Sequence, residues 1–334
     1  WASRPWASSR LVANRNGPTP HRVCPPMKAI TYSEFGSADV LTLTDLPEPH
    51  IGPDTMLVKV VASSVNPVDY KIREGYLQGL IDGDFPIVPG WDVAGIVVKP
   101  GLDTPEFEVG DEILAYARKD SLDGGALAEY ITVPVRTAAH KPAGLTFEQA
   151  AALPLAGLTA LQSVRRSKVR EGQVVLVHAA AGGVGSIAVQ LARHAGARVI
   201  GTASERNHDY LRSLGATPVT YGDDLVSQVK DLAPDGVDVI LDFVGGAAID
   251  TAPALLAHGG TITSITDARA RTELGGHYVW VRPDSAQLGE LAQLVVDGIV
   301  RVEIAQTFPL EQAADAHRAV ETGHVRGKVI VTVA

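Results

Sequence analysis

The first third of the chain alternates short apolar runs with clusters of glycine and proline. Turn-forming pairs such as Gly52-Pro53, Pro89-Gly90 and Pro100-Gly101 separate the runs. The runs predict strands over residues 27–32, 57–65, 95–98, 112–116 and 128–133. Several short strands with such turns between them are typical of a small barrel-like β domain, which we expect over residues 27–147.

The pattern changes after Leu145. Thr146 is a helix-capping residue with Glu148 in the first turn, and helix-forming sequence continues to about residue 164. Beyond it, apolar runs predict strands over residues 174–177, 198–202, 218–221, 237–243 and 261–265, and amphipathic runs predict helices over 184–194, 208–214, 225–232 and 249–257. Apolar strands between helices predict an α/β fold, a doubly wound parallel sheet covered on both faces, over residues 148–275.

The alternation stops near Gly275. The remaining patterns predict strands over residues 278–281, 299–304 and 328–333, and helices over 285–297 and 310–321. This stretch is too short to fold alone, so we expect it to return to the first domain. The predicted division is therefore residues 27–147 with 276–334 in one domain and residues 148–275 in the other.

Residues 1–26 differ from the rest of the chain. They carry four arginines, no acidic residue and the only cysteine, Cys24. We interpret them as a tag or non-native leader before a natural start at Met27, and we expect them to be disordered. Such a composition also marks organelle transit peptides, although the prolines disfavour an amphipathic helix.

The composition excludes several classes of protein. The 334 residues are 46 % hydrophobic and 20 % charged, which excludes a disordered chain, and the net charge of −9 disfavours binding to nucleic acid or to an anionic membrane. The uncharged stretch 172–192 is broken by glycines and is better explained by a strand, a turn and a helix. We expect a cytoplasmic protein. Because Cys24 is the only thiol, disulfides, cysteine nucleophiles and thiolate metal sites are excluded after Met27.

A glycine motif follows the predicted strand 174–177. Ala180, Gly182 and Gly185 have the spacing of a dinucleotide-binding fingerprint, with alanine in the first place, between a strand and a helix. Gly182 and Gly183 would let the backbone approach a pyrophosphate, and Gly185 would let the helix pack close to the strand. The helix N-terminus would supply amides and partial positive charge. The residues expected to contact the cofactor here are Ala181, Gly182, Gly183, Val184 and Gly185, and a simple packing turn is the alternative.

The end of the next strand selects between the two nicotinamide dinucleotides. NAD sites keep an acidic residue there, which binds the ribose 2′-hydroxyl. Ala203 stands at that position, and Arg206 follows it and can pair with a 2′-phosphate. This favours NADPH. The residues expected to read the phosphate are Ser204, Arg206, Asn207 and Tyr221. A solvated Arg206, or Glu205 in the role of the acid, is the alternative.

A series of motifs then identifies a family. The segments are SVNPVDY at 64–70, PGWDVAG at 89–95, VGD at 109–111, GALAEY at 125–130, AALP at 151–154, GLTA at 157–160, AAAGGVG at 179–185 and GKV at 327–329. In this order, over residues 27–334, they resemble the zinc-free quinone oxidoreductase branch of the medium-chain dehydrogenase/reductase superfamily. The resemblance implies a GroES-like β-rich catalytic domain, a Rossmann domain that binds NADP, a cleft for the nicotinamide between them, and a homodimer.

The resemblance also bears on zinc. Zinc-dependent relatives place a cysteine where Asn66 falls, a His–Glu pair where Trp91 and Asp92 fall, and a third ligand near residues 155–156. Only Asp92 among these can bind zinc, and a catalytic zinc ion needs three protein ligands. We therefore predict no metal, which disfavours alcohol dehydrogenase chemistry.

Without a metal, reduction depends on cofactor placement and on hydrogen-bond donors. Hydride transfer to a quinone or to the C=C bond of an enone creates an oxyanion that needs a donor. The resemblance places residues 66–71 at the cleft. Lys71 is the predicted donor, Asn66 and Tyr70 are alternates, and Asp69 is expected to position Lys71 or the ribose. A surface helix start for Tyr70 and Lys71, with Asn66 and Asp69 as caps, is the other interpretation.

The resemblance implies further cofactor contacts. Thr159, Ser264 and Ile265 would lie near the nicotinamide, Phe243 and Val244 near the adenosine, and Lys328 would approach the cofactor from the returning tail. Ordinary sheet packing is the alternative for each. Two rival functions are an enoyl-thioester reductase and a non-catalytic NADPH-binding or RNA-binding protein. The absence of a basic run disfavours the first, and the negative charge disfavours RNA.

Overall fold

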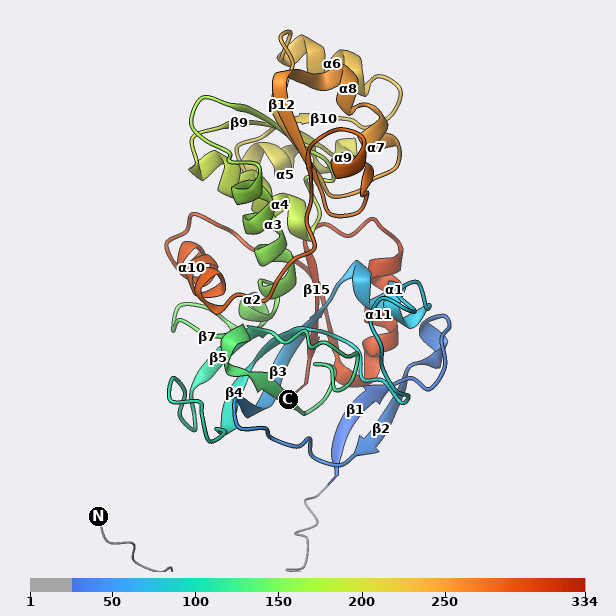
Figure 1. Cartoon of the computed structure of the whole chain (residues 1–334), viewed down its shortest axis with the longest axis vertical. Helices are drawn as coiled ribbons and strands as arrows, with labels where there is room; N and C mark the ends of the chain where they lie inside the picture. Colours follow the sequence, from blue (N-terminus) through green and yellow to red (C-terminus); the bar gives the residue numbers. More distant parts are fainter. Residues whose placement is uncertain (1–25, 334) are drawn as a thin grey trace, which may run out of the picture.

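Two β-sheets organise the chain. The computed structural model describes residues 26–333, so the expectation of disorder for residues 1–25 lies outside the described residues. In the view of Figure 1, a six-stranded sheet with its helices fills the upper part of the molecule, and a seven-stranded sheet fills the lower part. Among residues 26–333, no helix has the length and apolar character needed to cross a bilayer.

The six-stranded sheet is parallel throughout. In spatial order its strands are β10 (Thr217–Val219), β9 (Arg198–Thr202), β8 (Val174–Val177), β11 (Val237–Asp242), β12 (Leu256–Ser264) and β13 (His277–Tyr278). The chain runs outward from β8 in one direction and then from β11 in the other, which is the doubly wound arrangement. Val175 and Val177 are fully buried because helices cover both faces. The predicted α/β fold is confirmed.

Seven helices accompany this sheet in the described part of the chain. They are α3 (Pro154–Arg166), α4 (Gly183–His194), α5 (His208–Ser213), α6 (Leu225–Leu232), α7 (Ala247–Asp250), α8 (Ala252–Leu255) and α9 (Arg269–Thr272). The apolar face of α4, including Ile187 and Leu191, packs into the main core. Helix α4 begins at Gly183, within the glycine motif, so the sheet and this helix together position the motif.

The seven-stranded sheet forms the β-rich part. Its order is β14 (Ile304–Pro309), β15 (Lys328–Thr332), β3 (Thr55–Val65), β4 (Asp92–Lys99), β5 (Glu112–Tyr116) and β7 (Ala138–His140), with β6 (Tyr130–Pro134) also paired to β3. A separate pair consists of β1 (Met27–Thr31) and β2 (Thr42–Leu46). Helix α1 (Pro67–Arg73) follows β3, α2 (Phe147–Ala151) precedes α3, and α10 (Ser285–Val296) and α11 (Ala313–Glu321) precede β14 and β15.

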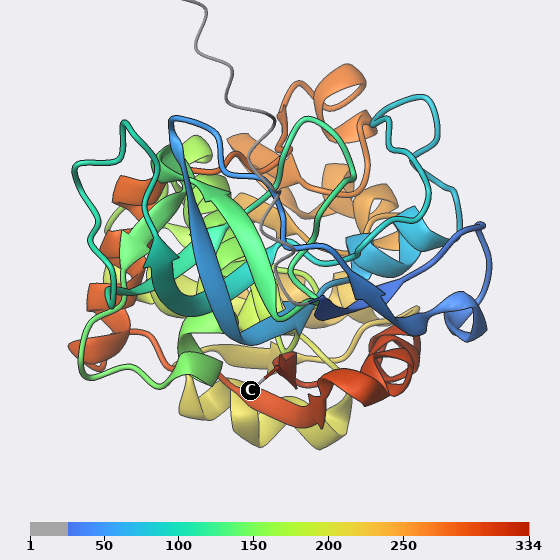
Figure 2. The same ribbon diagram turned by 90° about the horizontal axis from the view of Figure 1, so that it is seen from below.

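The last part of the chain returns to this sheet, as the sequence predicted. Strand β15 pairs antiparallel with β3, with Val329 opposite Val65. Figure 2 shows the red C-terminal segments beside the blue N-terminal ones, and an ion pair between Arg318 and Asp39 joins them. The boundary at residues 275 and 276 stays a prediction, and β13 extends the parallel sheet to Tyr278.

Two predicted helices are broken. The helix expected from Thr146 to residue 164 is divided into α2 and α3, because Pro154 has no N–H to continue α2 and instead begins a new helix. Thr146 does cap α2, since its side chain accepts from the N–H of Gln149. The helix expected over 249–257 becomes α7 and α8, and the chain is already in β12 at Leu256.

Two predicted strands are also wrong in extent. Residues 299–304 do not form a strand before Ile304, because the N–H groups of Ile299 and Val300 still donate to Leu294 at the end of α10. The strand expected over 278–281 is limited to β13. The predictions around β1, β3, β4, β5 and β6 are confirmed to within a few residues.

Candidate functional site

The glycine motif forms a tight turn between β8 and α4. A Cβ atom on Gly185 would lie 2.2 Å from the carbonyl oxygen of Ala179, so no side chain fits there. On Gly182, which precedes α4 with extended backbone, a Cβ would meet only that oxygen, at 3.4 Å. The first N–H groups of a helix have no partner within it, and they favour an anion. The turn therefore offers an open cradle that fits a pyrophosphate, while Gly185 serves packing.

The returning tail closes one side of this turn. Gly327 pairs with Gly182 in a parallel bridge, and its N–H donates to the carbonyl oxygen of Ala181 at 3.1 Å. A Cβ on Gly183 would come within 2.7 Å of Cδ of Lys328, so the stem of that lysine lies against the start of α4. The bridge was not predicted, because no local pattern pairs residues so distant in sequence.

The carboxyl ends of β11 and β12 lie at the same edge of the sheet as the turn. Asp242 is fully buried and accepts from the N–H groups of Val244 and Gly245 and from the Ser264 hydroxyl, at 3.0, 2.8 and 2.6 Å. Phe243 and Ile265 are half-buried and Val244 is exposed. Asp242 thus shapes the two loops predicted to contact the cofactor. The sequence analysis missed it, although a carboxylate at the end of an apolar strand is a usable signal.

Three of the residues predicted to contact the 2′-phosphate lie directly after β9. Ala203 is buried and its N–H donates to the last residue of β10, Val219. Ser204 accepts from the amide of Asn207 at 3.4 Å. Arg206 is exposed, and its guanidinium donates to the carbonyl oxygen of His324 at 3.2 Å.

The remaining predicted phosphate contact, Tyr221, is exposed two residues beyond the end of β10. Glu205 is exposed in the same short 3-10 turn as Arg206. Thr159 is buried within α3, where its hydroxyl donates to the carbonyl oxygen of Leu155 at 2.6 Å. The hydroxyl proton of Thr159 is therefore already donated to a hydrogen bond within α3.

Helix α1 carries the predicted donors. Pro67 is its first residue, and Asp69 accepts from the N–H of Asn66 at 2.7 Å, so these residues do form a cap. Burial raises the pKa of Asp69 to about 7. Tyr70 is half-buried, and partial burial raises the pKa of its hydroxyl. Lys71 is exposed. Tyr70 and Lys71 are thus the accessible members of the predicted donor group.

Asn66 lies in a buried polar network. Its amide nitrogen donates to Oδ2 of Asp92 at 2.7 Å, and its amide oxygen accepts from the ammonium of Lys328. That ammonium lies 3.6 Å from Asp92. Burial lowers the pKa of Lys328, while the Asp92 and Asp69 carboxylates oppose that shift. The structure brings Asn66, Asp69 and Lys328 together, but it directs the Lys328 ammonium toward α1.

A buried arginine fixes the C-terminal end of α1. Arg73 is fully buried, and its guanidinium donates to Nδ1 of His317 at 3.1 Å and to Glu321 at 2.7 Å, both on α11. Burial and then the Arg73 charge lower the pKa of His317 to about 3. The imidazole is therefore neutral and accepts from the arginine.

Comparisons with known proteins agree with this arrangement. The family model described as "Alcohol dehydrogenase GroES-like domain" matches residues 52–143, and the one described as "Zinc-binding dehydrogenase" matches residues 214–331. An NADPH-dependent alkenal/one oxidoreductase of Arabidopsis thaliana, described as chloroplastic, is 39 % identical over 91 % of this chain and 79 % of its own length. The structure of a quinone oxidoreductase from Coxiella burnetii is 37 % identical, with a TM-score of 0.83, over 92 % of this chain and all of that one.

The chain belongs to the quinone oxidoreductase branch of the medium-chain dehydrogenase/reductase superfamily. It is an oxidoreductase with a GroES-like domain and a Rossmann domain, as the sequence predicted. A mycobacterial member solved in complex with NADPH is 29 % identical, with a TM-score of 0.79, over 92 % of this chain and 99 % of that one. The family uses a nicotinamide dinucleotide, which fits the glycine turn.

One family description mentions zinc, and the residues do not fit it. Asn66, Trp91 and Leu155 offer no zinc ligand. Both oxygens of Asp92 already accept protein donors: Oδ1 accepts from the N–H of Leu155, and Oδ2 accepts from Ser64 and Asn66. The Lys328 ammonium faces the same carboxylate. Across residues 26–333, no cluster of three or more potential ligand side chains is arranged around a metal position.

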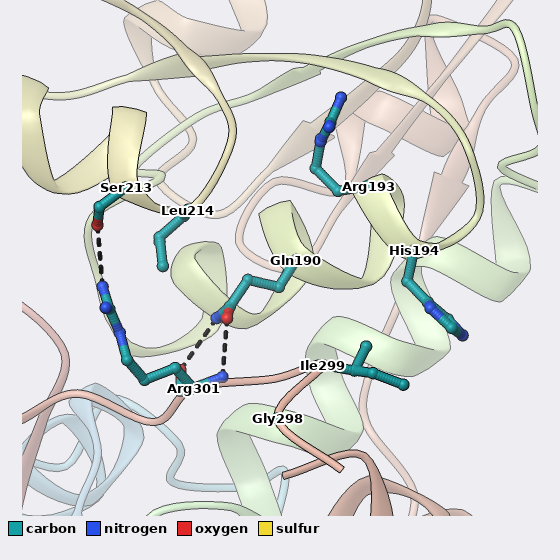
Figure 3. A pocket seen from close by; sticks show the side chains of 8 residues that line it. All are labelled: Gln190, Arg193, His194, Ser213, Leu214, Gly298, Ile299 and Arg301. Atoms are coloured by element: carbon teal, nitrogen blue, oxygen red, sulfur yellow. Dashed lines mark hydrogen bonds between the residues drawn. The ribbon is translucent and has the colours of Figure 1, made fainter.

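A cavity of about 420 Å³ lies elsewhere on this oxidoreductase. It is at the C-terminal end of α4, beside Arg193 and His194, whereas the glycine turn is at the N-terminal end. Figure 3 shows Arg193 and His194 pointing away from each other, while Gln190 holds the backbone of Arg301. The cavity is therefore separate from the glycine turn, at the opposite end of α4.

Proposed function

We propose that this oxidoreductase uses NADPH to reduce a quinone or the C=C bond of an enone. The observation that carries the cofactor choice is the end of β9, where buried Ala203 replaces the expected acid and exposed Arg206 follows. The named activities of the Arabidopsis and Coxiella relatives support the substrate class. The chloroplastic description of the first relative leaves the cytoplasmic location a prediction.

The chain's own residues would hold the cofactor and stabilise the product anion. The turn at Gly182 would bind the pyrophosphate, and Arg206 with Ser204 would bind the 2′-phosphate. Bound NADPH supplies the hydride. The acceptor oxygen gains negative charge as the hydride arrives, and a donor on α1, Lys71 first and Tyr70 second, would stabilise it. Water would provide the final proton.

Steady-state kinetics test this proposal directly. We expect oxidation of NADPH, followed by its absorbance, when 1,4-benzoquinone or a simple enone is added. A saturated ketone serves as the control acceptor and should give no turnover. NADH should be a weaker donor, and a chelator should not change the rate. Loss of activity with chelator and recovery with zinc would overturn the metal-free reaction, and binding without turnover of either acceptor would favour a non-catalytic role.

A homodimer is a separate part of the proposal. Strand β13 is an edge strand of the parallel sheet, and Trp280, just beyond it, is 42 % exposed. An edge strand with an exposed aromatic neighbour suits pairing with a second copy. Light scattering during gel filtration should give the dimer mass. A monomer mass at micromolar concentration would contradict this part and leave the catalytic proposal unaffected.

A further inference from the structure

Lys328 lies between the glycine turn and helix α1. It begins β15 directly after Gly327, which is bridged to the turn. Its aliphatic stem covers Gly183, where an added Cβ would approach Cδ of the lysine within 2.7 Å. The ammonium points toward the residue that precedes α1, Asn66. One side chain thus spans from the cofactor turn to the helix with the predicted donors.

The ammonium has two hydrogen-bond acceptors and one ion-pair partner within the protein. It donates to the amide oxygen of Asn66 and to the carbonyl oxygen of Val65, the latter at 3.4 Å, and it lies 3.6 Å from Oδ2 of Asp92. A lysine has three N–H donors. Two of them are directed at Val65 and Asn66, and the Asp92 carboxylate pairs with the charge, so the ammonium is engaged within the protein.

The Asp92 carboxylate beside the ammonium is also held by several protein donors. Asp92 is fully buried and accepts from Ser64 at 2.6 Å, from the Asn66 amide at 2.7 Å and from the N–H of Leu155 at 2.7 Å. Lys328 is itself only 5 % exposed. A buried charge left without its partner is strongly unfavourable, so the pair has one stable geometry. That geometry joins the ends of β3, β4 and β15 to the start of α3.

We propose that Lys328 is a positioning residue, not a phosphate ligand, and that it acts through Asn66 and Asp92 to set the distance between the cofactor turn and helix α1. The inference rests on the proposed function in one respect, namely that Tyr70 and Lys71 of α1 face the acceptor. A fixed distance keeps these donors in register with the nicotinamide. The buried ammonium also supplies positive charge to the carboxylate that zinc would otherwise meet.

A double-mutant cycle tests the proposal without any acceptor. The variants are Lys328→Met, which keeps the stem, Asp92→Asn, and the two together. We measure NADPH affinity by calorimetry and amide hydrogen exchange in residues 66–73 and 179–186 of the ligand-free protein. Each single variant should speed exchange in both segments and raise the Kd for NADPH about tenfold. The double variant should be no worse than the worse single one, because both break the same connection.

Two other outcomes would overturn it. If Lys328 binds phosphate directly, Lys328→Met weakens NADPH while Asp92→Asn does not, and the effects add. If the pair only stabilises the fold, the variants lower the melting temperature but leave NADPH affinity and exchange in both segments unchanged. Should Lys328→Met fail to fold because Asp92 loses its partner, the neutral double variant still supplies the exchange and affinity measurements.

Lys141→Met is the matched control. Lys141 is also buried, donates to the carbonyl oxygen of Leu145 at 2.8 Å and pairs with Glu112 at 2.8 Å, away from the glycine turn. We expect a lower melting temperature with normal exchange in both segments and normal NADPH affinity. Absence of acceptor turnover in the unaltered protein would sink the proposed function alone, whereas normal exchange in Lys328→Met would sink this inference alone.

Discussion

The cofactor side and the acceptor side of the site are built differently. At the glycine turn, backbone atoms set the shape, since Gly185 has no room for a side chain and Gly327 is bridged to Gly182. On α1, exposed Lys71 and half-buried Tyr70 carry the predicted chemistry. The loop after α1 leaves Leu80 76 % exposed. The contrast is between a turn shaped by backbone atoms and a helix whose predicted donors are side chains open to solvent.

The largest effect should come from filling the tight end of the turn. Gly185→Ala would place Cβ 2.2 Å from the carbonyl oxygen of Ala179 and 2.7 Å from Cα of Ala180, so α4 must move. We expect the free energy of unfolding to fall by about 3 kcal/mol, with loss of NADPH binding. Gly289→Ala is the control: it lies in α10, its nearest neighbour would be 3.8 Å away, and it should add up to about 1 kcal/mol. Equal stability of the two variants would refute the packing argument.

The next effect concerns the contact of His317 with the C-terminal end of α1, and it is a dependence of stability on pH. His317 has its pKa lowered to about 3, so acid protonates the unfolded chain first, beginning near about pH 6.5, and lowers the free energy of unfolding. His317→Asn keeps an acceptor for Arg73 but does not titrate. Between about pH 7 and pH 4, the unaltered protein should lose about 2–3 kcal/mol more than the variant in urea titrations.

The raised pKa of Asp69 acts in the opposite direction, because its stabilising contribution is lost as pH rises toward about 7. His178, whose pKa burial lowers to about 4, acts in the same direction as His317. Both groups are present in both proteins, so their effects cancel in the difference. Parallel stability curves would show that the pKa of His317 is not lowered in the folded state.

A smaller effect should distinguish the two cofactors. Arg206→Ala removes the cation predicted to pair with the 2′-phosphate, and a lost charge-assisted hydrogen bond corresponds to roughly 10- to 30-fold in NADPH affinity. NADH affinity should not change. Arg212→Ala, on the neighbouring helix α5, removes only an exposed pair with Asp209 and serves as the control. Equal losses for both cofactors in Arg206→Ala would contradict the assignment.

The smallest effect is expected on the acceptor side. Lys71→Ala should lower kcat about tenfold while NADPH affinity stays normal, because the lysine is predicted to meet only the developing oxyanion. Tyr70→Phe, which removes a single hydroxyl, should have a weaker effect of the same kind. An unchanged kcat in Lys71→Ala would remove that residue from the mechanism and leave Tyr70 as the candidate donor.

The elements that could be predicted are those whose patterns are local. Strands 174–177 and 198–202 and helix 225–232 have the predicted bounds, because each is defined by its own apolar spacing. Strand β2, Thr42–Leu46, was missed because its exposed polar residues pair only through a distant neighbour, β1. Ile299 and Val300 are apolar but remain bonded to the end of α10, which no spacing rule could indicate.

In the candidate site, too, features with a local sequence pattern could be predicted and features that depend on distant residues could not. The glycine turn is a contiguous motif, so its position between β8 and α4 could be predicted from the sequence. The direction of the Lys328 side chain could not be predicted, because it depends on Asn66, before α1, and Asp92, in β4, meeting at one point. Asp242 was overlooked because its partners, Val244 and Ser264, become neighbours only when β11 and β12 pair.

The bridge between Gly182 and Gly327 also has a consequence for biosynthesis. During translation the strands of the parallel sheet emerge well before the tail that is bridged to the glycine turn. N-terminal parts of a nascent chain generally fold first. The turn therefore acquires its finished form only after Gly327 and the start of β15 have been synthesised.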